Sequence, residues 1–232
     1  VAFGNLNEMR AAMSDKTAAI LVEPIQGEGG INPASSAYLQ SLRDIADEFN
    51  TLLIFDEVQC GMGRSGKLFA YETANVTPDI MGLAKGIGGG FPVGAVLATE
   101  KAASGMVPGT HGSTYGGNPL AMAAANAVLD VMLEKGFLSS VVKKGTKLKN
   151  DLVSLVEKHS TVLESVRGVG LMLGIKSVGP NLELMAAFRE NKLLTVVAGE
   201  NVVRVLPPLN VSEEEISEAV QKIDQTCSQV SS

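Results

Sequence analysis

The sequence has no tryptophan, only two cysteines and two histidines, and no block of basic residues. Cys60 and Cys227 lie too far apart to suggest a disulfide framework, and together with His111 and His159 they cannot form the pattern of a zinc site. The formal net charge of −6 gives no electrostatic surface for nucleic acid or for an anionic membrane. We therefore expect small molecules and other protein chains as partners, and a reducing, cytoplasmic environment.

Long uninterrupted apolar runs are also missing. The most apolar segment, 120–133, contains Asn126 and Asp130, so no transmembrane span is expected. The first residues, Val-Ala-Phe-Gly-Asn, lack the charged and apolar regions of a signal peptide. What the chain does have is size: 232 residues, 45% of them hydrophobic, can bury a substantial core in one large or two small domains.

Apolar runs alternate with a helical pattern in the first part of the chain. Segments 18–23 and 51–55 are continuous apolar runs, which are typical of strands in a parallel sheet covered on both faces. Between them, apolar residues recur every three or four positions from Tyr38 to Phe49, which predicts a helix capped by Ser35 or Ser36. Segment 24–33 reads as a loop. This order predicts an α/β fold with a right-handed crossover.

The rest of the chain changes character near residue 137. Up to that point the pattern predicts strands at 80–84 and 93–98, and a helix that Asn118 caps and Gly136 ends. Beyond it, we expect a charged helix, short strands and a last helix opened by a capping box: 143–159, 162–166, 170–176, 193–197, 202–206 and Ser212 with Glu215. We predict two domains: a large one with a mostly parallel sheet (1–136) and a smaller α+β one (137–232).

An acid and an amine follow two of the predicted strands. Asp56 comes directly after 51–55 and Lys85 directly after 80–84. If both strands belong to one parallel sheet, their carboxyl ends open on the same crevice, where α/β proteins bind ligands. An amine there can bind an aldehyde cofactor as a Schiff base, and a carboxylate can keep a pyridine nitrogen protonated. This pairing indicates pyridoxal 5'-phosphate, although strand-end charges are more commonly solvated or cap helices.

Four motifs occur around these two residues, in this order: Phe55-Asp-Glu-Val-Gln59, Gly61-Met-Gly-Arg-Ser-Gly-Lys67, Leu83-Ala-Lys-Gly-Ile-Gly-Gly-Gly-Phe-Pro92 and His111-Gly-Ser-Thr-Tyr-Gly-Gly-Asn-Pro119. The series resembles the class III aminotransferases, and the resemblance runs over essentially the whole chain. It implies the fold-type I aminotransferase architecture, in which a large cofactor domain is followed by a smaller C-terminal domain. Within the family, the motifs are most similar to members that act on N-acetylornithine.

The resemblance implies roles for the residues of the first and third motifs. Lys85 would hold the cofactor as its Schiff-base lysine and afterwards shuttle a proton. Asp56 would pair with the pyridinium nitrogen, Val58 would pack on the ring, and Gln59 would bond its phenolic oxygen. Ordinary core packing is the alternative for Val58. The glycines after Lys85 are no phosphate-binding P-loop, because a P-loop places its lysine after the glycines.

A second group of roles concerns the partner subunit and the substrate. Thr114, with Ser113, would reach the cofactor phosphate of a neighbouring subunit, so a homodimer with shared active sites is implied; a plain turn residue is the alternative. Arg204 would receive the α-carboxylate of glutamate, with Glu28 neutralising it at other times. An ordinary surface ion pair is the alternative. Glu23 would orient Gln59, or be a strand-end carboxylate without a catalytic part.

The implied reaction is transamination of N-acetyl-L-ornithine with 2-oxoglutarate, as in arginine biosynthesis. Ornithine, succinylornithine and 4-aminobutyrate aminotransferases are the close alternatives, and a nucleotide-binding α/β module is a weaker one. The resemblance begins partway through the family's usual chain, so its glycine-rich phosphate loop and stacking aromatic residue are not seen. A non-catalytic C-terminal fragment of such an enzyme is therefore a further alternative. We expect His159 to be solvated and Cys60 to be a packed thiol.

Overall fold

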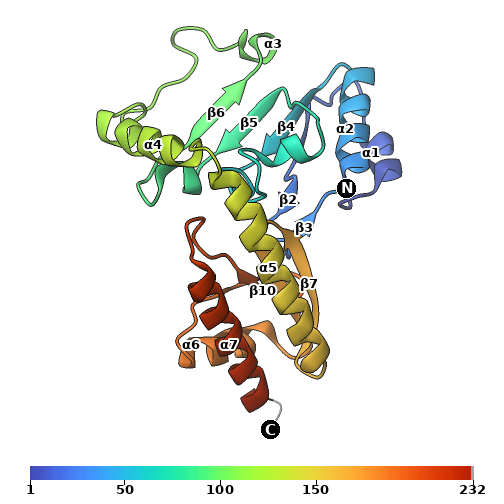
Figure 1. Ribbon diagram of the computed structural model, residues 1–232. Helices are drawn as coiled ribbons and strands as arrows, with labels where there is room; N and C mark the ends of the chain where they lie inside the picture. Colours follow the sequence, from blue (N-terminus) through green and yellow to red (C-terminus); the bar gives the residue numbers. More distant parts are fainter. Residues whose placement is uncertain (231–232) are drawn as a thin grey trace. The chain divides into compact units, whose positions relative to one another are not determined.

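The structure is a computed structural model that describes residues 1–230 (Figure 1). The chain forms two compact units, and the first comprises Val1–Pro24, Ala34–Met62 and Lys67–Lys135. The second contains Ile25–Pro33, Gly63–Gly66 and the described chain from Gly136 onward. These units differ from a single division after residue 136, because two short excursions pack with the later part. Their assignment as a cofactor domain and a small domain stays a prediction.

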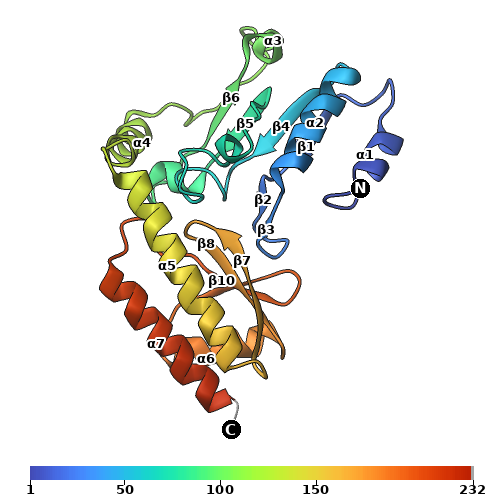
Figure 2. The same cartoon turned by 45° about the vertical axis from the view of Figure 1, so that its right-hand side comes forward.

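A four-stranded sheet forms the centre of the first unit (Figures 1 and 2). Its strands are β1 (Ala19–Val22), β4 (Leu52–Asp56), β5 (Ile80–Leu83) and β6 (Ala95–Ala98), in that spatial order. The first three are parallel, while β6 runs antiparallel to β5. The predicted α/β class with a mostly parallel sheet is confirmed.

One face of this sheet is covered by α2 (Ser36–Glu48). The Ser35 hydroxyl accepts a hydrogen bond from the Tyr38 backbone N–H at 3.1 Å, which confirms one of the two predicted caps. The apolar side of α2 packs against alternate residues of β1 and β4, and this core includes Leu39, Leu42, Ile45, Ile20, Leu53 and Phe55. Burial of these side chains fixes the register of the strands, since a one-residue slip would turn them to the other face.

The other face of the sheet is not covered as the apolar runs predicted. Leu21 on β1 is 68% exposed and Val96 on β6 is 76% exposed. The expectation of burial on both faces is therefore wrong within the described residues. Segment 24–33 was also predicted incorrectly, because β2 (Ile25–Gln26) and β3 (Asn32–Pro33) pair there as a small antiparallel hairpin.

The remaining elements of the first unit are α1 (Leu6–Ala12), η1 (Ala70–Thr73), η2 (Lys85–Gly88), α3 (Glu100–Ala103) and α4 (Pro119–Met132). Asn118 caps α4 as predicted, since its side-chain oxygen accepts from the Ala121 N–H at 2.9 Å. Gly136 does not end this helix. With a φ of 95°, it instead precedes the next one.

The second unit is an antiparallel sheet covered by helices. Its strands lie in the order β7-β8-β10-β9, and α5 and α7 lie side by side in both views (Figures 1 and 2). The bounds are α5 (Phe137–Lys158), β7 (Leu163–Val169), β8 (Met172–Ser177), α6 (Asn181–Glu190), β9 (Val196–Ala198), β10 (Val202–Val205) and α7 (Glu213–Val230). Helix α6 was not predicted. Within residues 1–230, no helix has the length and apolar character of a membrane span.

Two hydrogen-bonded features fix helix ends in this unit. The predicted capping box is confirmed, since the Ser212 N–H donates to Glu215 Oε2 at 2.7 Å and the Glu215 N–H donates to Ser212 Oγ at 3.1 Å. His159, expected to be solvated, is buried and bonded through Nε2 to Asp224 Oδ1 at 2.5 Å. The hydrogen bonds from His159 and Lys158 lower the pKa of Asp224.

Candidate active site

Asp56 and Lys85 lie at the same edge of the first unit's sheet. Strands β4 and β5 are parallel neighbours, and Asp56 is the register partner of Gly82. Lys85 follows just beyond Gly82 as the first residue of η2. Glu23 directly follows β1, in which Val22 is paired with Phe55, so Glu23 is level with Asp56. The three residues therefore share the carboxyl edge, where open α/β sheets bind ligands.

The turn after β4 has a fixed conformation. Asp56 Oδ1 accepts from the Val58 N–H at 3.0 Å, and the Gly61 N–H donates to the Glu57 carbonyl at 3.0 Å. The Glu57 N–H continues the strand pairing by donating to the Gly82 carbonyl at 3.0 Å. Val58 is half-buried on this turn, as is the neighbouring Gln59. The candidate ring-contacting residues are thus carried by backbone that is hydrogen-bonded on both sides.

Glu57 is a residue that the sequence analysis did not single out. Its side chain is fully buried, and its carboxylate accepts from the Ala70 N–H at 2.6 Å and the Tyr71 N–H at 2.8 Å. Burial outweighs these two hydrogen bonds and raises the pKa of Glu57 to about 7. The signal was present in the sequence: the period of two that buries Phe55 on the α2 side of the strand also buries Glu57.

Lys85 occupies an unusual backbone conformation. Its φ is +46°, in the left-handed region that side chains other than glycine adopt at a cost. The following residue is in close contact with the turn after β4, because a Cβ added at Gly86 would lie 3.1 Å from Met62 Cβ. Such outliers gather at functional sites, where surrounding structure holds them. The exposed side chain of Lys85 is thus attached to a main chain that is strained and held in place by its neighbours.

Ser113 and Thr114 lie in an exposed loop before α4. The Ser113 hydroxyl accepts from the Gly116 N–H at 3.0 Å, and Asn118 Nδ2 donates to the Tyr115 carbonyl at 2.9 Å. Among residues 1–230, neither hydroxyl is hydrogen-bonded to another candidate site residue. Within the described residues no hydrogen bond links this pair to Asp56 or Lys85, and their phosphate-binding role stays a prediction.

Arg204 and Glu28 do come together, within the second unit. Arg204 Nη1 donates to Glu28 Oε1 at 2.5 Å and Nη2 to Oε2 at 3.2 Å, although the residues are 176 positions apart. Nη2 also donates to the Val197 carbonyl at 2.9 Å. The arginine side chain is 6% exposed and that of Glu28 is 74% exposed. A buried guanidinium is thus paired with an exposed carboxylate, and the Glu28 side chain can move away from Arg204 into solvent. The substrate role of the pair stays a prediction.

The residues at the Asp56 edge suit pyridoxal phosphate. An exposed primary amine and a carboxylate lie at adjacent strand ends, and the residue that carries the amine has a left-handed backbone conformation. A metal site is not indicated, because residues 1–230 contain no cluster of three or more histidine, cysteine or acidic side chains placed to hold an ion. An amine and a carboxylate in this arrangement are the groups that a covalently held aldehyde cofactor requires.

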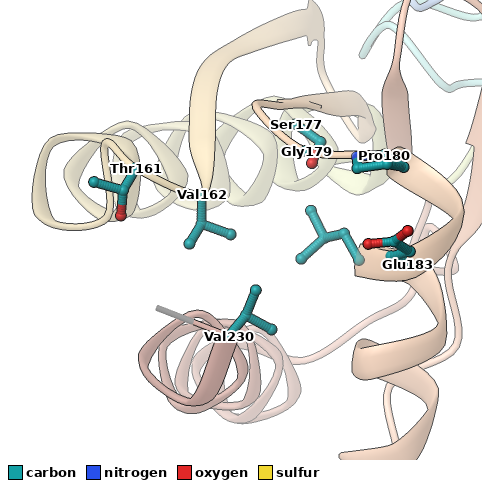
Figure 3. Close-up of a pocket in the computed structure, with 8 residues that line it drawn as sticks. Thr161, Val162, Ser177, Gly179, Pro180, Glu183 and Val230 are labelled. Atoms are coloured by element: carbon teal, nitrogen blue, oxygen red, sulfur yellow. The ribbon is translucent and has the colours of Figure 1, made fainter. Parts of the chain in front are cut away.

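A cavity of about 490 Å³ lies elsewhere, in the second unit (Figure 3). Val162, Val230 and Glu183 line it, and Figure 3 shows these side chains coming from the start of β7, α7 and α6. None of the candidate site residues lines this cavity. It therefore plays no part in the chemistry of the Asp56 edge or of the Glu28–Arg204 pair.

Comparison with known proteins decides the family. The sequence pattern described as "Aminotransferase class-III" matches residues 2–227. The chain therefore belongs to the class-III aminotransferases. It is 56% identical over 232 residues to acetylornithine aminotransferase 1 of Bradyrhizobium diazoefficiens, covering all of this chain and 57% of that protein. It is 54% identical over 223 residues to acetylornithine aminotransferase of Mesorhizobium japonicum, covering 96% of this chain and 56% of that protein.

Solved structures agree with this class-III assignment. An ornithine aminotransferase from Plasmodium yoelii superposes with a TM-score of 0.92 at 35% identity, over 99% of this chain and 62% of that one. Acetylornithine aminotransferase from Elizabethkingia anophelis superposes with a TM-score of 0.91 at 36% identity, over 99% of this chain and 59% of that one. The fold-type I aminotransferase architecture is thereby confirmed. The chain spans a little under three-fifths of the length of the curated relatives it matches.

Proposed function

We propose that this protein transfers the δ-amino group of N-acetyl-L-ornithine to 2-oxoglutarate with pyridoxal 5'-phosphate. The products would be N-acetyl-L-glutamate 5-semialdehyde and L-glutamate, a reaction of arginine biosynthesis. The observation that carries the reaction type is the placement of Asp56 and Lys85 at the carboxyl ends of adjacent parallel strands. The substrate rests on relatives of 56% and 54% identity that are named acetylornithine aminotransferases.

The cofactor, when bound, would supply an electron sink for the carbon that loses or gains the amino group. Asp56 would keep the ring nitrogen protonated, because a carboxylate beside it favours the charged form. Lys85 would hold the cofactor covalently and, once released, carry a proton through its amine. Val58 would cover one face of the ring and Gln59 would bond its oxygen substituent. The main-chain hydrogen bonds of the turn after β4 would keep both in place.

The substrate side would be controlled by Arg204 and Glu28. A terminal amine has no carboxylate on its reacting carbon, so Glu28 would remain on Arg204 and neutralise it. Glutamate carries a carboxylate on its reacting carbon. This planar α-carboxylate would replace the Glu28 carboxylate on the Arg204 guanidinium. The exposed position of Glu28 makes this exchange possible without burying an unpaired acid. Glu23, level with Asp56, would orient Gln59.

Ser113 and Thr114 would contribute to the phosphate site of a second subunit, which would make the active enzyme a homodimer. Ser113 and Thr114 lie in an exposed loop, so their side chains are accessible to a second subunit. We place the enzyme in the cytoplasm, since Cys60 and Cys227 are buried thiols.

The full-length enzyme, purified and assayed with each amino donor, tests the substrate. N-Acetyl-L-ornithine should give the highest kcat/KM of the four candidate donors. A clear preference for ornithine, succinylornithine or 4-aminobutyrate would replace the assignment. Ornithine is the alternative with a specific observation behind it, because an ornithine aminotransferase superposes with a TM-score of 0.92.

A non-catalytic role for the 232-residue chain alone is the second candidate, since it spans only 56–57% of these relatives. The chain is mixed with pyridoxal phosphate and reduced with borohydride, and the modified peptide is mapped. A label on Lys85 without turnover would support a cofactor platform that needs the remainder of an aminotransferase chain. If no lysine is labelled specifically, the cofactor assignment fails for the isolated chain.

A further inference from the structure

Arg167 ties together the two segments that carry Glu28 and Arg204. It lies on β7, and its Nη1 donates to Asn32 Oδ1 at 2.8 Å and to the Gly30 carbonyl at 3.4 Å. The same nitrogen is paired with the Glu200 carboxylate. Gly30 and Asn32 belong to the segment of Glu28, whereas Glu200 belongs to the turn that leads into β10. One guanidinium thus bonds the segments on both sides of the Glu28–Arg204 pair.

The segment of Glu28 is held through its backbone. The Glu28 carbonyl accepts from the Gly199 N–H at 2.7 Å. Asn32, the partner of Arg167, also donates through Nδ2 to the Gly29 carbonyl at 3.1 Å. A Cβ added at Gly30 would lie 2.9 Å from the Gly199 carbonyl, so the two segments are in close contact. These contacts leave the Glu28 side chain as the part that can move.

The opposite segment is equally fixed. Glu200 and Asn201 have φ values of 55° and 62°, so the turn between β9 and β10 holds two residues in the left-handed region. Asn201 Oδ1 accepts from the Asn181 N–H at 2.9 Å, and its Nδ2 donates to the Ser177 carbonyl at 2.6 Å. Arg204 lies on β10, which is paired on both sides, with β8 and with β9. The guanidinium of Arg204 therefore does not depend on Arg167 for its position.

On the basis of the proposed function, we infer that Arg167 is a positioning residue for substrate selection, which keeps Glu28 poised to return to Arg204. Opening the Glu28–Arg204 pair then costs only a side-chain movement, because the backbone of the loop stays attached through Arg167. Without that attachment the loop is looser, and the closed state, in which Glu28 neutralises Arg204, becomes less populated. Amino donors that need the closed state then bind more weakly, and carboxylates that compete with Glu28 for Arg204 bind more tightly.

The test uses the full-length holoenzyme with Arg167→Met, which keeps the apolar stem and removes every donor. KM for N-acetyl-L-ornithine should rise about tenfold, KM for glutamate should fall by about threefold or more, and both kcat values should stay within about twofold. Arg189→Met, which removes an exposed arginine of α6 in the same unit, should change neither KM. Equal changes in both KM values, or in both kcat values, would reduce Arg167 to a general stabilising residue and overturn the inference.

A binding measurement without turnover provides the second readout. Glutarate carries a carboxylate for Arg204 but no amine, and its affinity is measured by calorimetry. Glu28→Gln, which weakens the closed state directly, sets the benchmark and should bind glutarate more tightly than the wild type. Arg167→Met should shift in the same direction, by about threefold or more. Wild-type affinity, or weaker binding, in Arg167→Met would contradict the positioning role.

Two further variants separate the possible failures. Glu200→Gln removes only one arm of the Arg167 network, so it carries the same test, with a smaller shift, if Arg167→Met does not fold. Arg204→Met reports on the proposed function itself. If it binds glutarate as well as the wild type does, Arg204 is not the carboxylate site, and the proposed substrate exchange falls together with the inference. If only Arg204→Met and Glu28→Gln behave as expected, the proposed function stands and the role of Arg167 is refuted.

Discussion

Replacing Glu57 with glutamine should change how the stability of the chain depends on pH. Burial raises the pKa of Glu57 from 4.5 to about 7, so the folded chain binds this proton more tightly than the unfolded chain does. The stabilising contribution of the protonated carboxyl is fully present below about pH 4.5 and is lost as the pH rises through about 7. A pKa difference of this size corresponds to about 3 kcal/mol of unfolding free energy.

The glutamine of Glu57→Gln does not titrate, so its stability lacks this slope. In this variant the amide NH₂ faces a backbone N–H that the carboxylate accepted from, which changes the unfolding free energy by the same amount at every pH. The unfolding free energy of the variant minus that of the wild type should therefore increase by about 3 kcal/mol between about pH 4.5 and about pH 8.

Urea unfolding followed by far-UV circular dichroism, repeated across this pH range, measures the difference. Glu134→Gln, which changes an exposed acid just after α4, should show no such increase. A difference that stays constant with pH, or that falls, would mean that the bonds from Ala70 and Tyr71 outweigh burial and keep Glu57 ionised. The reasoning about this carboxylate would then be refuted.

Three other changes have definite expected outcomes. Lys85→Met should abolish borohydride-fixed labelling by pyridoxal phosphate without lowering the unfolding midpoint; labelling at an unchanged level would move the cofactor lysine elsewhere. Gly61→Ala places a Cβ 2.7 Å from the Glu57 carbonyl and should cost about 1–3 kcal/mol in urea unfolding, whereas Gly105→Ala, with no atom within 4 Å, should cost little. Asp224→Asn should lower stability by at most about 1 kcal/mol at neutral pH, since hydrogen bonds from His159 and Lys158 lower the pKa of Asp224 but solvent screens these surface pairs. That deficit should shrink as the pH falls through the lowered pKa, and a deficit that grows on acidification would contradict it.

The features that could be predicted from sequence are those with local causes. Asn118, and Ser35 as one of two candidates with Ser36, were predicted as helix caps because a capping side chain bonds a backbone N–H within its own turn. The common edge of Asp56 and Lys85 followed from two apolar runs and the rule that parallel strands end together. Both inferences needed only a few neighbouring residues and the assumption of one sheet.

The features that were missed depend on contacts between distant segments. The strand period indicates the burial of Glu57, but its own motif does not indicate the two backbone donors of η1 that satisfy the carboxylate. His159 is buried by its bond to Asp224, 65 positions away, although a charged helix precedes it. The pairing of Glu28 with Arg204 was suggested by resemblance, but only the fold could bring the two together.

The left-handed backbone of Lys85 has a consequence for engineering. At a φ of +46°, glycine would be relaxed where lysine is strained by about 1–3 kcal/mol. A directed-evolution campaign that selects variants only for heat resistance would therefore favour Lys85→Gly and discard the amine. At Lys85, selection for thermal stability opposes retention of the amine. Variant libraries built on this chain should therefore keep Lys85 unchanged.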